Sequence, residues 1–194
     1  MKILIGCEES QVLCSTFRKA NYEAYSCDIL STRGNPLWHY KADIMTIIPK
    51  ESWTLIILHP DCTALALSGN KWYGKNCPKH KERLASIKWT LALWEMAKQY
   101  SKAVALENPQ SVIFNYLYNV QYIQPYQFGH TENKMTGFAL YNLPRLIPTN
   151  VVAGYNNNVH NMGPNKNRKR DRSITYQGIA DAIVCQWGNH IKKL

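Results

Sequence analysis

The stretch LIILHPDCTALALSG, residues 55–69, joins an apolar run to a loop that contains a cysteine. Leu55 to Leu58 form the apolar run, and His59-Pro60-Asp61-Cys62 follow it directly. A short apolar run that is bounded by a turn signal is typical of a buried strand. Two interpretations of Cys62 are open. It fills space in an ordinary turn, as most free cysteines do, or the chain presents a nucleophile at the edge of a sheet.

Strand-like and helix-like segments alternate along the rest of the chain. We expect strands over 2–6, over a segment that ends at residue 28, and over 54–58, 102–106, 120–124 and 137–141. Helices are expected over 11–21, 79–100 and 174–191, where apolar residues recur at helical spacing. The longest of them carries an apolar face made of Leu84, Ile87, Leu91 and Trp94. This alternation predicts an α/β fold with a mostly parallel, doubly wound sheet.

Polar and ionisable residues follow four of the expected strands. In chain order they are Glu8 and Glu9, then Asp28, then Asp61 and Cys62, and finally Glu107 and Asn108. Ligands of doubly wound sheets bind outside the carboxyl ends of the strands, near a topological switch point. We therefore expect these residues to converge on one cleft.

Glu107-Asn108-Pro109 ends the fourth expected strand and has two interpretations. A carboxyl group placed after an apolar strand can have a pKa raised by desolvation, and so donate a proton near neutral pH. Alternatively, Asn108 caps the N-terminus of a helix that begins near residue 110.

The first loop and Asp28 together point to a cofactor. Asp28 lies about 20 residues after that loop, where nucleotide-binding α/β folds place an acid that binds ribose hydroxyls. The loop itself, Gly6-Cys7-Glu8-Glu9-Ser10, has one glycine and two acids and would repel a pyrophosphate. A cofactor with a ribose and a positive sulfonium fits better, which favours S-adenosylmethionine over NAD.

Composition limits the class of protein. With 194 residues, 45% of them hydrophobic, the chain can form one domain with a sizeable core. The six cysteines show no metal-ligand spacing, so we expect free thiols in a reducing cytoplasm and no metal site. The sequence has neither an apolar run of membrane-spanning length nor a signal peptide, so we expect a cytoplasmic protein without a membrane partner.

The net charge of +10 suggests an anionic partner, either a nucleic acid or a nucleotide. Its densest cluster is Lys166-Asn167-Arg168-Lys169-Arg170-Asp171-Arg172, at the end of a polar segment, about 150–172, that we expect to be a long basic loop. The cluster could contact a phosphate backbone, or it could be a solvated loop.

Seven segments resemble one enzyme family. They are LIGCEES (4–10), SCD (26–28), ADI (42–44), HPDC (59–62), ENP (107–109), QPYQFGH (124–130) and GIADAIVCQWG (178–188). Their order resembles cytosine-C5 methyltransferases, in particular the small phage- and prophage-type proteins, across nearly the whole chain. The resemblance implies a Rossmann-like S-adenosylmethionine-dependent methyltransferase fold and methyl transfer to C5 of cytosine in DNA.

The resemblance also implies roles for residues. Cys62 would add to C6 of the pyrimidine, Glu107 would hold and protonate N3, and Asn108 would brace the cysteine loop. The cofactor-binding positions would be Cys7, Glu8, Glu9, Ser10, Asp28, Asp43, Ile44 and Pro60. Among them, the acids of the first loop and Ser10 would surround the methionine part, Asp28 the ribose, and Asp43-Ile44 the adenine.

Residues on the substrate side follow from the same comparison. They are Trp72, Gln127, His130, Lys134, Arg168, Lys169, Arg170 and Arg172. Gln127, His130 and Lys134 stand roughly where the family has an arginine motif, and the basic residues would contact phosphates. Trp72 could stack on a base or be a half-buried core aromatic. A base in a duplex would have to be flipped out to reach Cys62.

Two departures keep other functions open. Asp61 stands where the family has a second proline, and an anion beside a thiol raises its pKa. The segment between Tyr141 and Ser173 is too short for a separate target-recognition domain, so residues 1–194 would form a single domain. Sequence preference would then be weak or supplied by a partner subunit. The alternatives are a catalytically inactive methyltransferase-fold protein that binds nucleic acid or a host protein, and a methyltransferase that acts on free nucleotide or RNA.

Overall fold

The computed structural model describes residues 1–153, 156 and 168–194, with the side chains of residues 168 and 169 excepted. Its strands are β1 (Lys2–Gly6), β2 (Glu23–Asp28), β3 (His39–Lys41), β4 (Trp53–Leu58), β5 (Ser101–Pro109), β6 (Val120–Ile123) and β7 (Thr136–Tyr141). Its α-helices are α1 (Val12–Lys19), α2 (Ile44–Ile47), α3 (Asn70–Tyr73), α4 (His80–Tyr100), α6 (Arg168–Ser173) and α7 (Gln177–Ile191). Short 3-10 helices are η1 (Pro36–Trp38), η2 (Ile48–Lys50), η3 (Leu67–Gly69), η4 (Val112–Asn115) and η5 (Pro125–Gln127).

All seven strands belong to one sheet, in the order β3-β2-β1-β4-β5-β7-β6. The pairs from β3 to β5 are parallel, and β7 is antiparallel to both β5 and β6. The prediction of a mostly parallel α/β sheet is therefore confirmed. The order reverses between β1 and β4, which makes this pair the topological switch point.

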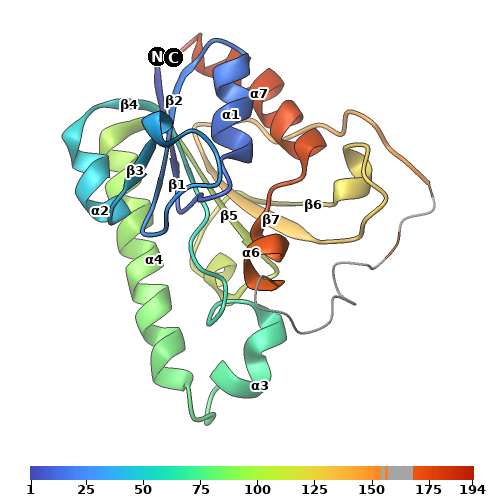
Figure 1. Ribbon diagram of the computed structural model, residues 1–194. Coiled ribbons are helices and arrows are strands. Elements are labelled where there is room, and N and C mark those ends of the chain that lie inside the picture. Colours follow the sequence, from blue (N-terminus) through green and yellow to red (C-terminus); the bar gives the residue numbers. More distant parts are fainter. Residues whose placement is uncertain (154–155, 157–167) are drawn as a thin grey trace.

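Helices cover both faces of the sheet (Figure 1), so the sheet is doubly wound. The residues of β1 alternate between two cores, with Ile3 and Ile5 on one face and Leu4 on the other. The first core is completed by α1 and α7, including Phe17 and Trp187, and the second by α2 and α4. Fully burying an aliphatic side chain of this kind stabilises the fold by about 1.5–3 kcal/mol. The fully buried positions of β1 and β4 explain why both read as continuous apolar runs.

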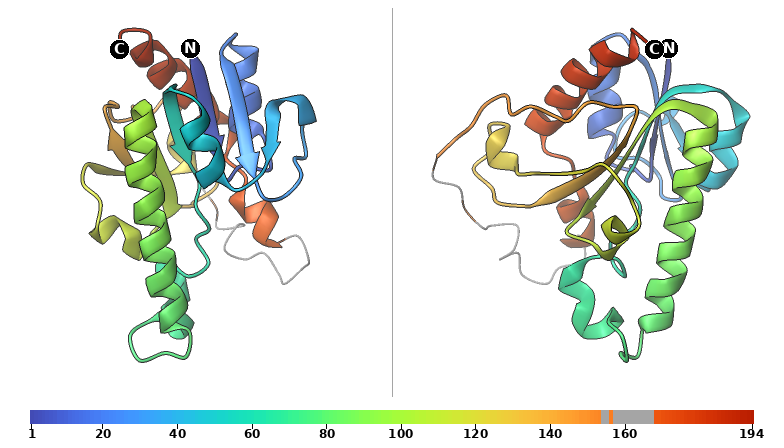
Figure 2. Two further views of the ribbon diagram at one scale, coloured as in Figure 1. Left: turned by 90° about the vertical axis from the view of Figure 1, so that its left-hand side faces the viewer. Right: turned by 180° about the vertical axis from the view of Figure 1, so that it is seen from behind.

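Helix α4 buries most of the predicted face, because Ile87 and Trp94 are buried and Leu91 is half-buried against the same core. Leu84 is 52% exposed, so its place on the apolar face is wrong. The buried residues of α4 are Arg83, Ile87, Thr90, Leu93, Trp94 and Ala97. The first turns of α4 project beyond the sheet and lie beside α3 (Figure 2). There the helix meets polar loop backbone instead of the apolar sheet.

Arg83 joins α4 to the loop after β4. Its Nε donates to the Ala64 carbonyl at 2.7 Å, and its Nη2 donates to the Ala66 carbonyl at 3.2 Å. Nη1 donates to Asn70 Oδ1 at 2.7 Å. These acceptors explain how a guanidinium that is only 5% exposed is tolerated. Arg83 therefore holds the loop that carries Cys62.

Two further boundaries differ from the predictions. The prediction of a long basic loop is wrong for its last residues, because Arg168–Ser173 form helix α6. The segment 157–167 of that predicted loop lies outside the described residues. Strand β5 continues through Glu107 and Asn108, since both pair with β7. Within the described residues, we find no helix with the length and apolar character needed to cross a membrane.

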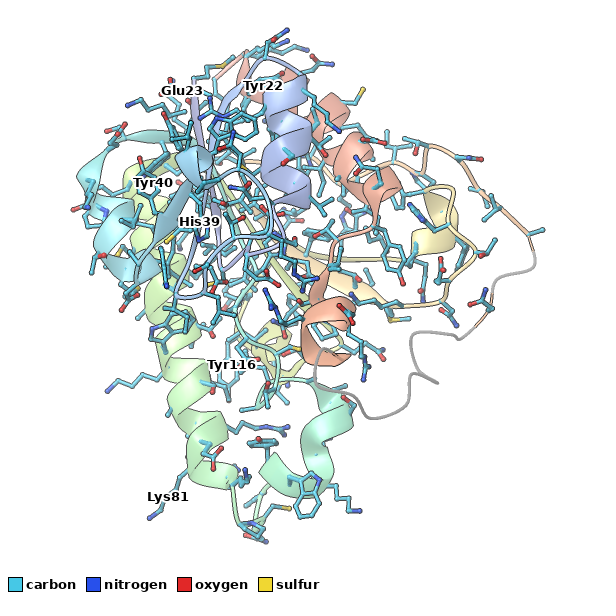
Figure 3. The ribbon with its side chains drawn as sticks, viewed as in Figure 1. Tyr22, Glu23, His39, Tyr40, Lys81 and Tyr116 are labelled. Atoms are coloured by element: carbon cyan, nitrogen blue, oxygen red, sulfur yellow. The ribbon has the colours of Figure 1, made fainter. Side chains whose placement is uncertain are left out.

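We predict that Arg83→Ala lowers the free energy of unfolding by on the order of 3 kcal/mol, because three acceptors lose a charged donor. Urea unfolding followed by circular dichroism measures this difference. The matched control is Lys81→Ala on the same helix. Lys81 points away from α4 into solvent (Figure 3), so this change should leave stability within about 0.5 kcal/mol of wild type. Equal losses in both variants would contradict the proposed role of Arg83.

Candidate active site

The loops after β1 and β4 meet at the switch point of the sheet. The backbone N–H of His59 donates to the Gly6 carbonyl at 2.9 Å, which continues the β1–β4 pairing one residue beyond the strands. Both loops lie at the carboxyl edge, while the two chain termini lie together at the opposite edge (Figure 1). The predicted cleft therefore falls where doubly wound folds bind ligands.

The Cys62 loop is fixed by β5. The Asn108 side-chain amide donates to the Pro60 carbonyl at 2.9 Å, and Ser111 Oγ donates to the Leu65 carbonyl at 3.1 Å. Asn108 is 1% exposed, so this bond is sheltered from water. The helix-cap interpretation of Asn108 is wrong, because Ser111 is the cap of η4. Cys62 is half-buried, and its own carbonyl accepts the backbone N–H groups that begin a tight turn.

Asp61 is exposed, and its carboxylate closes the same turn. Oδ1 accepts from the backbone N–H of Thr63 at 3.0 Å and from the Thr63 hydroxyl at 2.6 Å. Asx turns of this kind order a loop locally. The aspartate that replaces a proline in the resemblance thus supplies hydrogen bonds where proline would supply stiffness.

Glu107 is paired with His59, which the sequence analysis did not include among the site residues. His59 Nδ1 lies 3.2 Å from Glu107 Oε2, and both side chains are mostly buried. Burial pushes the pKa of Glu107 up, but the His59 hydrogen bond and the charges of His59 and Lys134 outweigh it, so that the pKa lies below its usual value. The expectation of a raised pKa is therefore wrong. A titratable residue directly after a buried strand was the available signal for His59.

Lys134 belongs to the same electrostatic neighbourhood. Burial lowers the pKa of the Lys134 ammonium, and the charges of Glu107 and Cys62 oppose that shift. Its Nζ donates to the Arg172 carbonyl at 2.7 Å. Cys62, Glu107 and Lys134 come from three different segments of the chain and thus interact through their charges.

Glu8 points into the protein and holds helix α1. Its carboxylate accepts from the backbone N–H groups of Leu13 at 2.7 Å and Cys14 at 3.2 Å, and the residue is 5% exposed. Burial raises the pKa of Glu8 to about 7, although the charge of His59 and these hydrogen bonds oppose the shift. Glu8 therefore titrates near neutral pH.

Glu9 is bound by two arginines. Arg33 donates to it through Nε at 2.9 Å and Nη2 at 2.6 Å, and Arg170 donates through Nε at 3.1 Å and Nη2 at 2.8 Å. Burial alone would raise the pKa of Glu9, but the hydrogen bonds from both arginines lower it. Arg170, which the sequence assigned to phosphate contact, is thus held by a carboxylate. This pairing fixes helix α6 to the first loop.

Three carboxylates affect the remaining part of the first loop through their charge. Burial and the charges of Asp28, Asp43 and Asp61 all raise the pKa of the Cys7 thiol. Asp28 accepts from the Leu30 N–H at 2.8 Å, and Asp43 caps α2 by accepting from the Met45 N–H at 2.9 Å. Oxygen acceptors of this number suit hydroxyls and a cation, and they would repel phosphates.

The other predicted cofactor residues act through packing or through hydrogen bonds within the loops, such as that of the Ser10 side chain with Glu8. Ile44 is buried against Gly6, where an added Cβ would lie 2.9 Å from Ile44 Cδ1. Pro60 is buried and contributes its carbonyl to Asn108, and Ser10 is half-buried. Ile44 therefore acts through packing, and Gly6 is needed for the close approach of α2.

The residues predicted on the substrate side differ in their exposure and in their hydrogen-bond partners. Trp72 is 54% exposed, so the core interpretation of this residue is wrong. Gln127 Oε1 accepts from the Gln124 N–H at 2.7 Å, and His130 Nε2 accepts from the Gly178 N–H at 2.9 Å, so both hold local structure. Arg172 is half-buried, and the side chains of Arg168 and Lys169 lie outside the described part of the chain. Within that described part, no group of three or more His, Cys, Asp or Glu residues could hold a metal ion.

Comparison with known proteins supports the fold. No protein-family profile matches the chain, and no curated protein matches it. Among solved structures, it is similar to a protein described as a DNA modification methyltransferase encoded within a prophage (E. coli). The TM-score is 0.52 and the identity is 9%, over 78% of this chain and 52% of that chain. The chain thus spans about half the length of that protein, and its architecture is consistent with a Rossmann-like methyltransferase fold.

We predict a pH dependence of stability that arises from Glu8. Below its unfolded pKa of about 4.5, both states hold the proton. Between about 4.5 and about 7 only the folded state keeps it, so the unfolded state binds fewer protons and stability falls as pH rises. The loss is complete above about 7 and is on the order of 3 kcal/mol. Urea unfolding of wild type and Glu8→Gln across this range should show the fall in wild type alone; parallel curves would contradict it.

We also predict that Glu9→Gln releases helix α6, because neutral Gln cannot accept bidentate hydrogen bonds from two guanidinium groups. Amides of residues 168–173 should then exchange with deuterium faster than in wild type. The control is Glu95→Gln, which removes an exposed carboxylate paired with Lys98 on α4. Unchanged exchange in α6 would show that other contacts hold it.

Proposed function

We propose that the protein transfers a methyl group from S-adenosylmethionine to C5 of cytosine in DNA, with Cys62 as the nucleophile. The observation that carries the proposal is the hydrogen bond from Asn108, next to Glu107 on β5, to Pro60 in the Cys62 loop that follows β4. The fold likeness to a protein described as a DNA modification methyltransferase supports it.

The chain's own residues supply most of the chemistry. The Cys62 thiolate would form a bond to C6 of the ring, which moves electron density to C5. Glu107 would contact N3 and supply the proton that this density shift requires. Asn108 would keep the Cys62 backbone in place, and the charge of Lys134 would favour the thiolate over the thiol.

S-adenosylmethionine fits the acids around Cys7. When bound, it supplies an electrophilic methyl group next to a sulfonium charge. Asp28 has a half-buried carboxylate that accepts from the Leu30 N–H, and it could also accept ribose hydroxyls. The loop has few groups that would bind a phosphate, in agreement with a cofactor that contains none.

The test is a covalent complex. Duplex DNA with 5-fluorocytosine, incubated with protein and S-adenosylmethionine, should give an adduct in denaturing mass spectrometry. Cys62→Ser should lose the adduct but keep cofactor binding in calorimetry, and Asp28→Asn should weaken that binding by about tenfold or more. The matched control is Cys185→Ser, which changes an exposed cysteine on α7 and should leave the adduct unchanged. Absence of an adduct and of methyl transfer on every cytosine substrate would contradict the proposal.

A second candidate is a catalytically inactive protein that binds nucleic acid or a host protein, and exposed Asp61 beside Cys62 favours it. Calorimetry with S-adenosylmethionine separates the two, because an inactive relative has no need of tight cofactor binding. A third candidate is methylation of free nucleotide or RNA. It is favoured by the pairing of Arg170 with Glu9, which leaves one fewer guanidinium for a duplex backbone. Comparison of dCMP, single strands and duplex as acceptors distinguishes these substrates.

A further inference from the structure

His59 and Glu107 form a buried ionisable pair inside the candidate active site. The side chains are 11% and 19% exposed, and Nδ1 lies 3.2 Å from Oε2. His59 Nε2 is buried without a hydrogen-bond partner among the described residues. An ionised carboxylate can only accept, so Nδ1 is the donor in this pair. A histidine that donates to a carboxylate favours the ionised form of that carboxylate.

Ionisable groups from three neighbouring segments affect the same pair. Lys134, which precedes β7, adds a positive charge that also favours ionised Glu107. Glu8, from the loop after β1, interacts with His59 through its charge, and Cys62 interacts with Lys134 in the same way. Burial opposes the effects of His59 and Lys134, because it favours the neutral form of Glu107. The protonation state of Glu107 therefore depends on whether His59 is present.

Protonation of Glu107 decides which ring edge it can bind. Cytosine presents N3 as an acceptor, so it needs a protonated carboxyl group that donates to N3. Uracil carries its own hydrogen on N3, so it needs an ionised carboxylate that accepts. Wrong pairing places two acceptors or two donors against each other in a buried site, which costs about 1–3 kcal/mol per unsatisfied group.

We propose that His59 is a positioning residue that sets, through Glu107, the balance between cytosine and uracil rings at this site. This inference rests on the proposed function, since it assumes that Cys62 adds to a pyrimidine. With cytosine, the thiolate forms the C6–S bond, the C5=C6 electron pair moves to C5, and the Glu107 O–H proton passes to N3. With uracil the same bonds form while Glu107 stays ionised and only accepts from N3–H. By favouring ionised Glu107, His59 shifts the balance towards the uracil ring as pH rises, while addition to cytosine draws on the protonated fraction of Glu107.

The experiment follows exchange of the C5 hydrogen for solvent deuterium in oligonucleotides that contain deoxycytidine or deoxyuridine. This exchange requires addition to C6 but no cofactor. In wild type, the uracil-to-cytosine ratio of exchange rates should rise with pH as Glu107 ionises. His59→Phe should move that rise to higher pH by about one unit or more, which is about tenfold in the ratio near neutral pH. His59→Asn keeps an amide donor near the position of Nδ1 and should restore part of the shift.

A purely structural role for His59 would lower both rates together and leave the ratio unchanged, which would overturn the inference. The carboxyl ¹³C signal of Glu107, assigned by its loss in Glu107→Gln, gives a readout that needs no activity. Its titration midpoint should rise in His59→Phe, and an unchanged midpoint also overturns the inference. Failure of wild type to exchange either ring would instead overturn the proposed function, and with it the ring selectivity.

Discussion

The parallel pairing of β4 with β1 on one side and β5 on the other is the constraint on which the site depends. Residues 55–58 of β4 are fully buried, and their register with β5 sets His59 beside Glu107. The hydrogen bond from the His59 N–H to the Gly6 carbonyl extends the pairing with β1. Chemistry-bearing residues that are far apart in the sequence meet because β1 and β4 end at one level and β5 runs past them on the same side.

Acidic residues gather at the carboxyl edge of the sheet, although the protein as a whole is basic. The protein carries a net charge of +10, yet the loops at the switch point hold Glu8, Glu9, Asp28 and Asp61. Two of these acids are satisfied within the protein, Glu8 by the start of α1 and Glu9 by two guanidinium groups. Asp28 is half-buried and accepts from the Leu30 N–H of its own loop.

Six of the seven strands were predictable from the sequence, since buried parallel strands leave continuous apolar runs that end in polar residues. Strand β3 (His39–Lys41) was not predicted, because it is short and only partly buried. The contacts between distant side chains were not predictable. Arg83 reads as a solvated helix residue, because nothing in the sequence says that α4 continues past the sheet and meets loop carbonyls. Likewise, burial alone predicts a raised pKa for Glu107, and only the three-dimensional position of His59 reverses the direction.

Helix α6 illustrates the same limit. The residues that form it look like one block of positive charge, yet Arg170 and Arg33 share Glu9 from the first loop. The partners of an exposed arginine depend on which carboxylate the fold brings near it. The local sequence around an arginine does not show which carboxylate will lie near it in the folded protein.

The hydrogen bonds between Glu9 and Arg170 also have a consequence for the order of folding. Glu9 and Arg170 are 161 residues apart, so their contact closes almost the whole chain into a loop. Contacts of such separation form late, because the entropy of loop closure has to be overcome before they contribute. The strands can therefore pair while the chain is still being synthesised, but the first loop and α6 can meet only after residues 168–173 have been made. The carboxyl edge of the sheet would be the last part of this molecule to become ordered.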